Sequence, residues 1–491
     1  MTVRTAKIIF SVGFALSISG CTVGPKYQRA SAPVTAHWDV PEPWRESAPK
    51  DALSKGEWWT VFNDETLNSL EKEAVAANET LKVATVHLEQ ARASAAIQVS
   101  TQFPQVATAP SASRQRLSGN RAKVSGAIPS VPLTQSSYTL PFTVSYEVDL
   151  FGRRRRSIES AQASYQATAA DLENTRLVIA AELAGDYFTL RQIDTQLGIL
   201  RRTVDTLSKG LDLVNSRHSG GVASGLDVAQ EETLLNTTRT QAILLRQQRK
   251  QLEDAIAVLV GKPAPDFHLP SNELDAEPPS INAGLPSDLL ERRPDIAEAE
   301  RQMAVANAQV GIARAAYFPS LNLYANGGWQ ASDIAKLANV QSTLWAIGAN
   351  AAESIFTGGA RRAQMQFAKA GYDASVANYR QTVLNAFGEV QDDVTGLLVL
   401  NEAQKSQQDA VDAARRTLDI ADSRYKGGLV SYLDVVSAQQ NLLNNEQEMA
   451  VIRGQKLVTS VLLVKALGGG WDSSSLAAVQ VKSKLKDVVA P

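Results

Sequence analysis

The same long motif is written twice in this chain. Segments 211–228 and 418–435 are identical at ten of eighteen aligned positions, at an offset of 207 residues. The offset also holds outside the motif, since Arg154 corresponds to Arg361 and Glu182 corresponds to Glu389. A period of about 200 residues is much longer than the roughly 20–50 residues of solenoid repeats. The sequence therefore predicts two copies of one large unit.

The chain begins with a segment that is typical of secreted proteins. Arg4 and Lys7 precede an uncharged apolar run at 8–18, which is too short for a membrane-spanning helix. Residues 1–20 are therefore predicted to be a signal peptide. Cys21 follows directly and is the only cysteine, so it has no disulfide partner. A stray buried thiol is the alternative, but this position favours lipid attachment.

The segment Ile18-Ser19-Gly20-Cys21 is similar to a bacterial lipobox. This resemblance implies acylation of Cys21, with palmitate among the attached chains. Several acyl chains on one residue would anchor the protein durably. Thr22, in place of Asp, implies that the lipoprotein goes to the outer membrane.

Composition argues against several classes of function. The formal net charge is −2 and the isoelectric point is about 6.2, which leaves no basic surface for nucleic acid. The four histidines show no metal-ligand spacing. The chain lacks a phosphate-binding loop, a His-Glu-x-x-His motif and a nucleophile motif. We therefore expect no catalytic residue, no metal and no cofactor apart from the covalent lipid.

Each unit is predicted to contain one very long helix and two shorter ones. Segments 152–218 and 361–425 contain no proline, and a helix of about 65 residues is roughly 100 Å long. Apolar residues at steps of three and four predict one shorter helix over 67–102 and another over 294–317. Return helices are predicted to run to Gly261 and Gly468.

A helical hairpin tip is predicted between each long helix and its return helix, at 218–224 and 425–431. Paired glycines fit a turn through positive φ, and a Ser followed by an Asp three residues later resembles a capping box. These tip residues are Gly220, Gly221, Ser224, Asp227, Gly427, Gly428, Ser431 and Asp434.

The segments 104–151 and 319–356 are predicted to hold two strands each, around polar loops at 114–137 and 330–342. Alternate residues from Tyr138 to Leu150 are apolar, and most of those between them are polar. An open sheet cannot lie in lipid, because its edges would carry unpaired backbone groups. Four strands cannot close a barrel, but two chains supply eight strands and three supply twelve.

The predicted organisation follows from these elements. It comprises the signal peptide 1–20, a proline-rich periplasmic arm 21–66, repeat one 67–261, a proline-rich linker 262–293, repeat two 294–468 and a C-terminal tail 469–491.

Three features together resemble the TolC/OprM-type outer membrane factors, and among them the NodT-like efflux lipoproteins. These features are the segment 291–300 (Glu-Arg-Arg-Pro-Asp-Ile-Ala-Glu-Ala-Glu), Tyr317-Phe318-Pro319, and the repeated tip motif. The resemblance implies a mixed, mainly α fold. It would be a homotrimer whose 12-stranded outer-membrane β-barrel, with four strands per chain, continues into a long periplasmic α-helical barrel. It also implies a passive export channel for drugs or other small toxic molecules in a tripartite RND-type pump, with a periplasmic adaptor and an inner-membrane pump as partners.

The same resemblance places adaptor docking and a closed constriction at the hairpin tips. Segment 429–433 contains no acidic residue, so we expect an apolar constriction formed by Val430 and Tyr432. The four arginines at 153–156 are expected to form a charged collar where barrel meets helix.

Two alternative functions stay open at this point. The outer duct of a type I protein-secretion system would share nearly every feature, and neighbouring genes would distinguish it. A lipid-anchored coiled-coil scaffold without a pore is disfavoured by the strand ending at Leu150.

Overall fold

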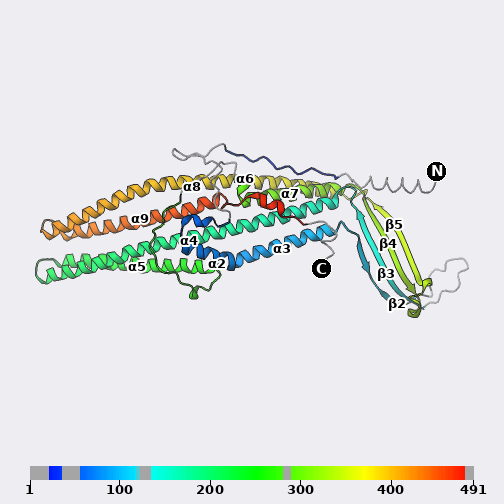
Figure 1. Ribbon diagram of the computed structural model, residues 1–491, viewed down its shortest axis with the longest axis horizontal. Helices are drawn as coiled ribbons and strands as arrows, with labels where there is room; N and C mark the ends of the chain where they lie inside the picture. The colour runs from blue at the N-terminus through cyan, green and yellow to red at the C-terminus, as the bar shows by residue number, and fades with distance from the viewer. Residues whose placement is uncertain (1–21, 36–55, 119, 121–133, 280–288, 482–491) are drawn as a thin grey trace.

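The computed structural model describes residues 22–35, 56–118, 120, 134–279 and 289–481. A long bundle of helices carries a β-sheet at one end, and two helical hairpin tips lie at the other end (Figure 1).

Two helices of 67 residues run the length of the bundle. They are α4 (Arg153–Ser219) and α8 (Ala360–Lys426), each about 100 Å long, as the absence of proline predicts. Each begins after a glycine in the left-handed region, Gly152 with φ 83° and Gly359 with φ 87°. Only glycine adopts this conformation without strain.

The shorter helices pack along these two. α5 (Gly225–Leu259) and α9 (Tyr432–Ala466) return from the tips, and α7 (Pro294–Ala315) precedes the second pair of strands. α4 contacts α3 (Glu79–Ser100), α5, α7 and α9, whereas α8 contacts α7 and α9. α4 is therefore the central helix of the protomer, and α8 lies at its margin (Figure 1).

The single helix predicted over 67–102 is wrong. The structure has α2 (Glu65–Ala77) and α3 (Glu79–Ser100), separated by Asn78 in an extended conformation. The Asn78 Oδ1 accepts a hydrogen bond from the Leu81 amide at 3.1 Å, and its Nδ2 donates to the Leu259 carbonyl at 2.9 Å. Asn78 thus caps α3 and fastens the end of α5 at the same point.

The proline-rich arm is extended only in part. Residues 22–35 carry no helix or strand, and the Arg29 Nε donates to the Tyr379 hydroxyl on α8. Near its end, however, the short 3₁₀ helix η1 (Trp58–Phe62) buries Trp58, Trp59 and Phe62 in the largest hydrophobic core. The arm therefore ends as part of the core.

Two further segments pack onto α4: the linker that joins the repeats, and the C-terminal tail. The linker contains η2 (Ala264–Asp266) and one helical turn, α6 (Leu289–Arg292). The buried Asp194 of α4 accepts hydrogen bonds from Arg249, Ser271 and the Asn272 amide. In the tail, η6 (Ser473–Ala478) is followed by two hydrogen bonds between the Gln162 side chain and the backbone of Val479 and Val481.

The sheet contains strands from both repeats in one antiparallel order. β1 (Gln105–Thr108) and β2 (Ser111–Arg116) pair with β3 (Thr134–Val148), which pairs with β4 (Ser320–Ala331), which pairs with β5 (Thr343–Ala352). β1 and β2 keep one register against β3, so they form one strand position interrupted at Pro110, which has no amide to donate. Each chain thus supplies four strand positions, as predicted.

The polar loop predicted at 114–137 is too long. Arg116 still pairs with Thr134, so the first hairpin extends further than expected. The second loop agrees with the prediction and holds two short turns, η4 (Ile334–Lys336) and η5 (Val340–Ser342). Among the described residues, none of the helices combines the length and the apolar character needed to cross a membrane.

Candidate functional site

The two faces of the sheet differ sharply in chemistry. Cross-strand pairing puts Leu140 beside Trp329 and Phe142 beside Gly327 and Thr108, so these residues share one face. That face is mainly apolar and includes Val106, Thr108, Ala112, Tyr138, Leu140, Phe142, Val144, Tyr146, Val148, Leu321, Leu323, Ala325, Trp329, Trp345, Ile347 and Ala349, with Arg114 and Arg116 at its far end. Trp345 and Ile347 are nearly four-fifths exposed in the single chain.

The opposite face is polar and nearly uncharged. It carries Gln105, Ser111, Ser113, Thr139, Thr143, Ser145, Glu147, Asn322, Tyr324, Asn326, Gln330 and Asn350. The described sheet also ends in two unpaired edges, β1 with β2 on one side and β5 on the other. An apolar outer face, a polar inner face and two open edges are what a segment of a closed membrane barrel requires.

The four arginines predicted as a collar lie where the sheet meets α4. Arg153 and Arg154 form ion pairs with Glu147 at 2.7 and 3.0 Å, and Arg155 pairs with Asp149 at 3.2 Å. Asp149 also accepts hydrogen bonds from the first amides of α4, which stabilises the helix start. Each of these three arginines thus has a carboxylate partner within the chain, with Glu147 shared by two of them, as expected for a charged collar.

Arg156 differs from the other three because it is buried. It pairs with Glu159 at 2.7 Å and donates to the Gly24 carbonyl. A Cβ added at Gly311 would lie 2.9 Å from the Arg156 Cδ. Gly311 on α7 therefore leaves space for the Arg156 side chain, which connects α4 to Gly24 in the N-terminal arm.

Only the second glycine of each tip has the predicted conformation. Gly221 has φ 75° and Gly428 has φ 72°, whereas Gly220 and Gly427 have φ of −81° and −78°. The Val222 amide donates to the Arg217 carbonyl, and the Leu429 amide donates to that of Arg424. Both tips therefore use one helix-ending turn that needs a single left-handed residue.

Both capping boxes are present. The Ser224 amide donates to the Asp227 carboxylate at 3.1 Å, and the Ser431 amide donates to the Asp434 carboxylate at 3.1 Å. Both aspartates are therefore held at helix starts, as their spacing predicts.

The prediction that Tyr432 lines a constriction is wrong. Tyr432 is 5 % exposed and packs with Val214, Val435 and Tyr425 between the two hairpins. Its ring lies 4.9 Å from that of Tyr425, which also contacts Arg217. A side chain enclosed by its own protomer cannot narrow a duct. Val430, the other predicted constriction residue, is half-buried.

A buried carboxyl accompanies Tyr432. Glu231 of α5 is fully enclosed, and a Cβ at Gly210 would lie 2.5 Å from its Oε1 and 3.5 Å from the Tyr432 hydroxyl. Burial raises the pKa of Glu231, and the Tyr432 hydroxyl opposes this only in part. Burial and Glu231 also raise the pKa of Tyr432. The two hairpins thus meet through a polar contact inside an apolar cluster.

The sequence reasoning missed four exposed apolar residues at the tips. Val222 and Leu226 are 78 % and 65 % exposed, and their counterparts at the 207-residue offset, Leu429 and Leu433, are 72 % and 53 % exposed. The aligned motif contains them, but it does not show which face they occupy. Nearby, a groove between α5 and α9 is lined by Leu226, Leu234 and Val436 with several amide and hydroxyl groups.

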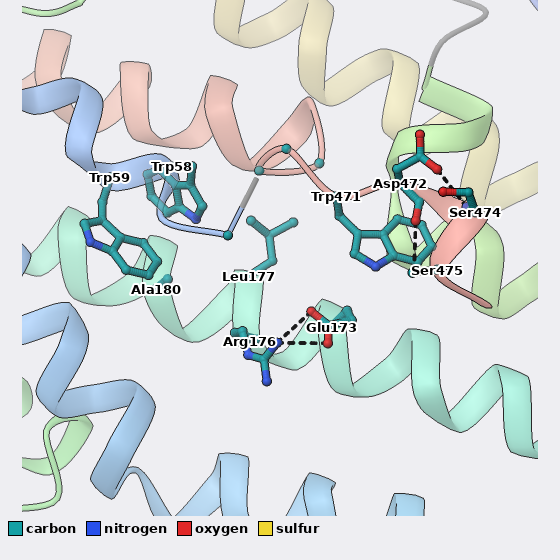
Figure 2. Close-up of a pocket in the computed structure, with 14 residues that line it drawn as sticks. Trp58, Trp59, Glu173, Arg176, Leu177, Ala180, Trp471, Asp472, Ser474 and Ser475 are labelled. Carbon is teal, nitrogen blue, oxygen red and sulfur yellow. Dashed lines mark hydrogen bonds and ion pairs between the residues drawn. The ribbon is translucent and has the colours of Figure 1, made fainter. Parts of the chain in front are cut away.

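A cavity of about 450 Å³ lies midway along the bundle, where the arm and the C-terminal segment meet α4. Figure 2 shows Trp58, Leu177 and Trp471 around it, with the ion pair between Arg176 and Glu173 at one side. The described residues contain no cluster of three or more potential metal-binding side chains. Cys21 lies outside the described residues.

Comparison with known proteins decides the family. A family model described as outer membrane efflux protein matches residues 70–262 and 285–469, one segment for each repeat. The chain belongs to this family. The toluene efflux pump outer membrane protein TtgF of Pseudomonas putida is 33 % identical over 473 residues, covering 95 % of this chain and 97 % of the relative.

Other relatives of this efflux protein agree. The pyoverdine export outer membrane protein OpmQ of Pseudomonas aeruginosa is 33 % identical over 462 residues, covering 93 % of this chain and 96 % of OpmQ. The solved outer-membrane channel OprN superposes with a TM-score of 0.82 at 28 % identity, covering 92 % of this chain and all of that one. The fold is thus that of trimeric outer-membrane channels with a helical periplasmic part.

These findings narrow the alternatives. Three chains with four strand positions each give the predicted twelve-stranded barrel. This efflux protein is an efflux channel of the Gram-negative outer membrane, and it extends into the periplasm. The poreless scaffold is not supported, because the solved relatives are channels. Family and fold are those of channel proteins and not of enzymes.

Proposed function

We propose that this efflux protein is the outer duct of a tripartite pump that expels small organic molecules. One observation carries the proposal: a polar sheet face, opposite an apolar one, lies at one end of a protomer whose other end exposes matched apolar tips. The relatives TtgF and OpmQ are named for toluene efflux and pyoverdine export. The almost uncharged polar face would suit substrates of varied charge.

The tips are the proposed docking surface for a periplasmic adaptor. Val222 and Leu226 on one tip repeat as Leu429 and Leu433 on the other, so each trimer would present six similar apolar tips. Exposed apolar residues rimmed by polar ones are typical of protein interfaces. The groove between α5 and α9 continues this surface. The adaptor would in turn connect the duct to an inner-membrane pump.

Lipid attachment at Cys21 fits the position of the residues that follow it. The Val23 amide donates to the Phe151 carbonyl at 3.1 Å, and Thr22 packs against Gly152. Both contacts lie at the junction of sheet and helices, which is the periplasmic surface of the membrane in this family's fold. An acyl chain starting one residue earlier would enter the adjacent leaflet.

A deletion strain of the source bacterium tests the function. We expect the strain to accumulate a fluorescent efflux substrate and to become sensitive to antibiotics or organic solvents, and the intact gene should restore both. A variant with serine at 222, 226, 429 and 433 should still form trimers but fail to restore efflux. Unchanged accumulation and resistance in the deletion strain, with a secreted protein retained in the cells, would instead support a type I secretion duct.

A further inference from the structure

The hairpin formed by β2 and β3 is strongly basic. Between Ser111 and Thr134 the sequence contains three arginines and one lysine and no acidic residue. The corresponding hairpin of the second repeat, 330–343, contains one aspartate and one lysine. The positive charge is therefore a property of the first hairpin alone.

The register puts two of these arginines on the apolar face of the sheet. Ala112 pairs with Tyr138, Arg114 with Ser136, and Arg116 with Thr134. Because side chains alternate along a strand, Arg114 and Arg116 share the face of Tyr138 and Phe142. That face would contact lipid, so these cations project outward and away from the duct.

Their height along the strand corresponds to the membrane surface. Tyr146 and Tyr138 of β3 lie on the apolar face, eight residues apart, or about 27 Å along the strand. A strand tilt of about 35–45° reduces this length to a height of roughly 19–22 Å. In outer-membrane barrels an apolar band about 25 Å tall lies between two aromatic girdles. Arg114 and Arg116 pair with Ser136 and Thr134, which lie two and four positions from Tyr138 towards the loop of this hairpin. The two arginines therefore lie roughly 7 and 14 Å further along the strand than Tyr138. This places them among lipid headgroups.

Within one chain, no carboxylate in the described part of this end pairs with the two arginines. The one acidic residue among the described residues there is Asp333, and its Oδ1 accepts a hydrogen bond from the Ala335 amide. β3 lies between β2 and β4, the strand that precedes Asp333. All six residues of β2 are exposed in the single chain. Closure of the barrel would pair the backbone edge of β2 with a neighbouring chain and leave the side chains of Arg114 and Arg116 on the lipid-facing surface.

We propose that Arg114 and Arg116 bind the phosphate groups of an anionic lipid in the outer leaflet. Guanidinium groups bind phosphate through two parallel hydrogen bonds. Two arginines about 7 Å apart along one strand could contact two phosphates of one headgroup. Three such pairs would surround each trimer. The proposal rests on the proposed function only for the placement of the sheet in the outer membrane.

The test measures binding of fluorescent diphosphorylated lipid A to the purified full-length trimer in detergent. The variant R114Q/R116Q should bind about 25-fold more weakly, since each surface cation contributes roughly fivefold. R114K/R116K should retain most of the affinity, and K336Q, which removes a cation from the other hairpin, should bind as the wild type does. Added inorganic phosphate at equal concentration should displace little lipid.

Two results would overturn the proposal. One is unchanged lipid binding by a trimeric R114Q/R116Q protein. The other is complete displacement of the lipid by inorganic phosphate, which would show a general anion site. R114Q/R116Q should also restore efflux in the deletion strain. Failure of the wild type in that assay would count against the proposed function, and not against lipid binding.

Discussion

Glu71 on α2 offers a quantitative test of the protomer core. Its side chain is fully buried, and neither carboxylate oxygen has a hydrogen-bond partner among the described residues. Burial raises the pKa of Glu71 from 4.5 to about 9. The folded protein therefore holds a proton that the unfolded chain releases above pH 4.5. Stability should consequently fall as the pH rises from 4.5 towards 9.

The size of this effect follows from linkage. Each pH unit between the two pKa values costs about 1.4 kcal/mol. At pH 7 the cost is therefore about 3 kcal/mol, and it approaches zero near pH 4.5. Glu71→Gln keeps the shape of the side chain and removes the titration. The variant should match the wild type near pH 5 and become progressively more stable than the wild type towards pH 8.

Thermal unfolding of the detergent-solubilised trimer at several pH values measures this difference. We expect Glu71→Gln to raise Tm by several degrees at pH 8 and by little at pH 5. Glu73→Gln is the matched control, because Glu73 is two residues away, partly exposed, and paired with Lys262. Surface pairs contribute at most about 1 kcal/mol. A Glu71→Gln protein whose Tm parallels that of the wild type at every pH would refute the reasoning.

Three further substitutions test the tips and the anchor. Gly428→Val should cost about 1–2 kcal/mol because φ is positive there, and it should weaken adaptor crosslinking before it weakens the trimer. Gly427→Val, at φ −78°, is the milder control, and equal effects of the two would contradict the turn assignment. Tyr432→Ala should cost about 3–5 kcal/mol and speed amide exchange in α5 and α9. Tyr432→Phe keeps the ring and loses only the hydroxyl beside Glu231, so it should have a smaller effect on both; equal exchange in both variants would argue against packing by the ring. Cys21→Ala should abolish incorporation of labelled palmitate while the trimer persists, and label in the variant would disprove acylation at Cys21.

Local sequence signals predicted the features that depend on local physics. Proline-free stretches predicted α4 and α8, and Ser-x-x-Asp spacing predicted both capping boxes. Alternation from Tyr138 onward predicted the apolar and polar faces of the sheet. In each case the deciding interaction lies within a few residues of the chain, so a single segment contains the information.

Features that depend on packing between distant segments were not predictable. Tyr432 was predicted to be exposed at a hairpin tip, but the helices α4 and α5 of the first helical hairpin enclose it. Asn78 interrupts a helix because α5 ends against it, although an asparagine before Glu79 is a cap signal that could have been noticed. Trp58 lies in the predicted proline-rich arm, and its burial depends on α4 and on the end of α9.

The number of chains in the assembly extracted from the membrane tests the central claim most directly. Each described protomer carries four strand positions with two unpaired edges, so the duct closes only when several chains combine. Native mass spectrometry of the full-length protein in mild detergent should give a mass of three lipid-modified chains. A stable monomer or dimer would contradict the account, because neither can form the twelve-stranded duct.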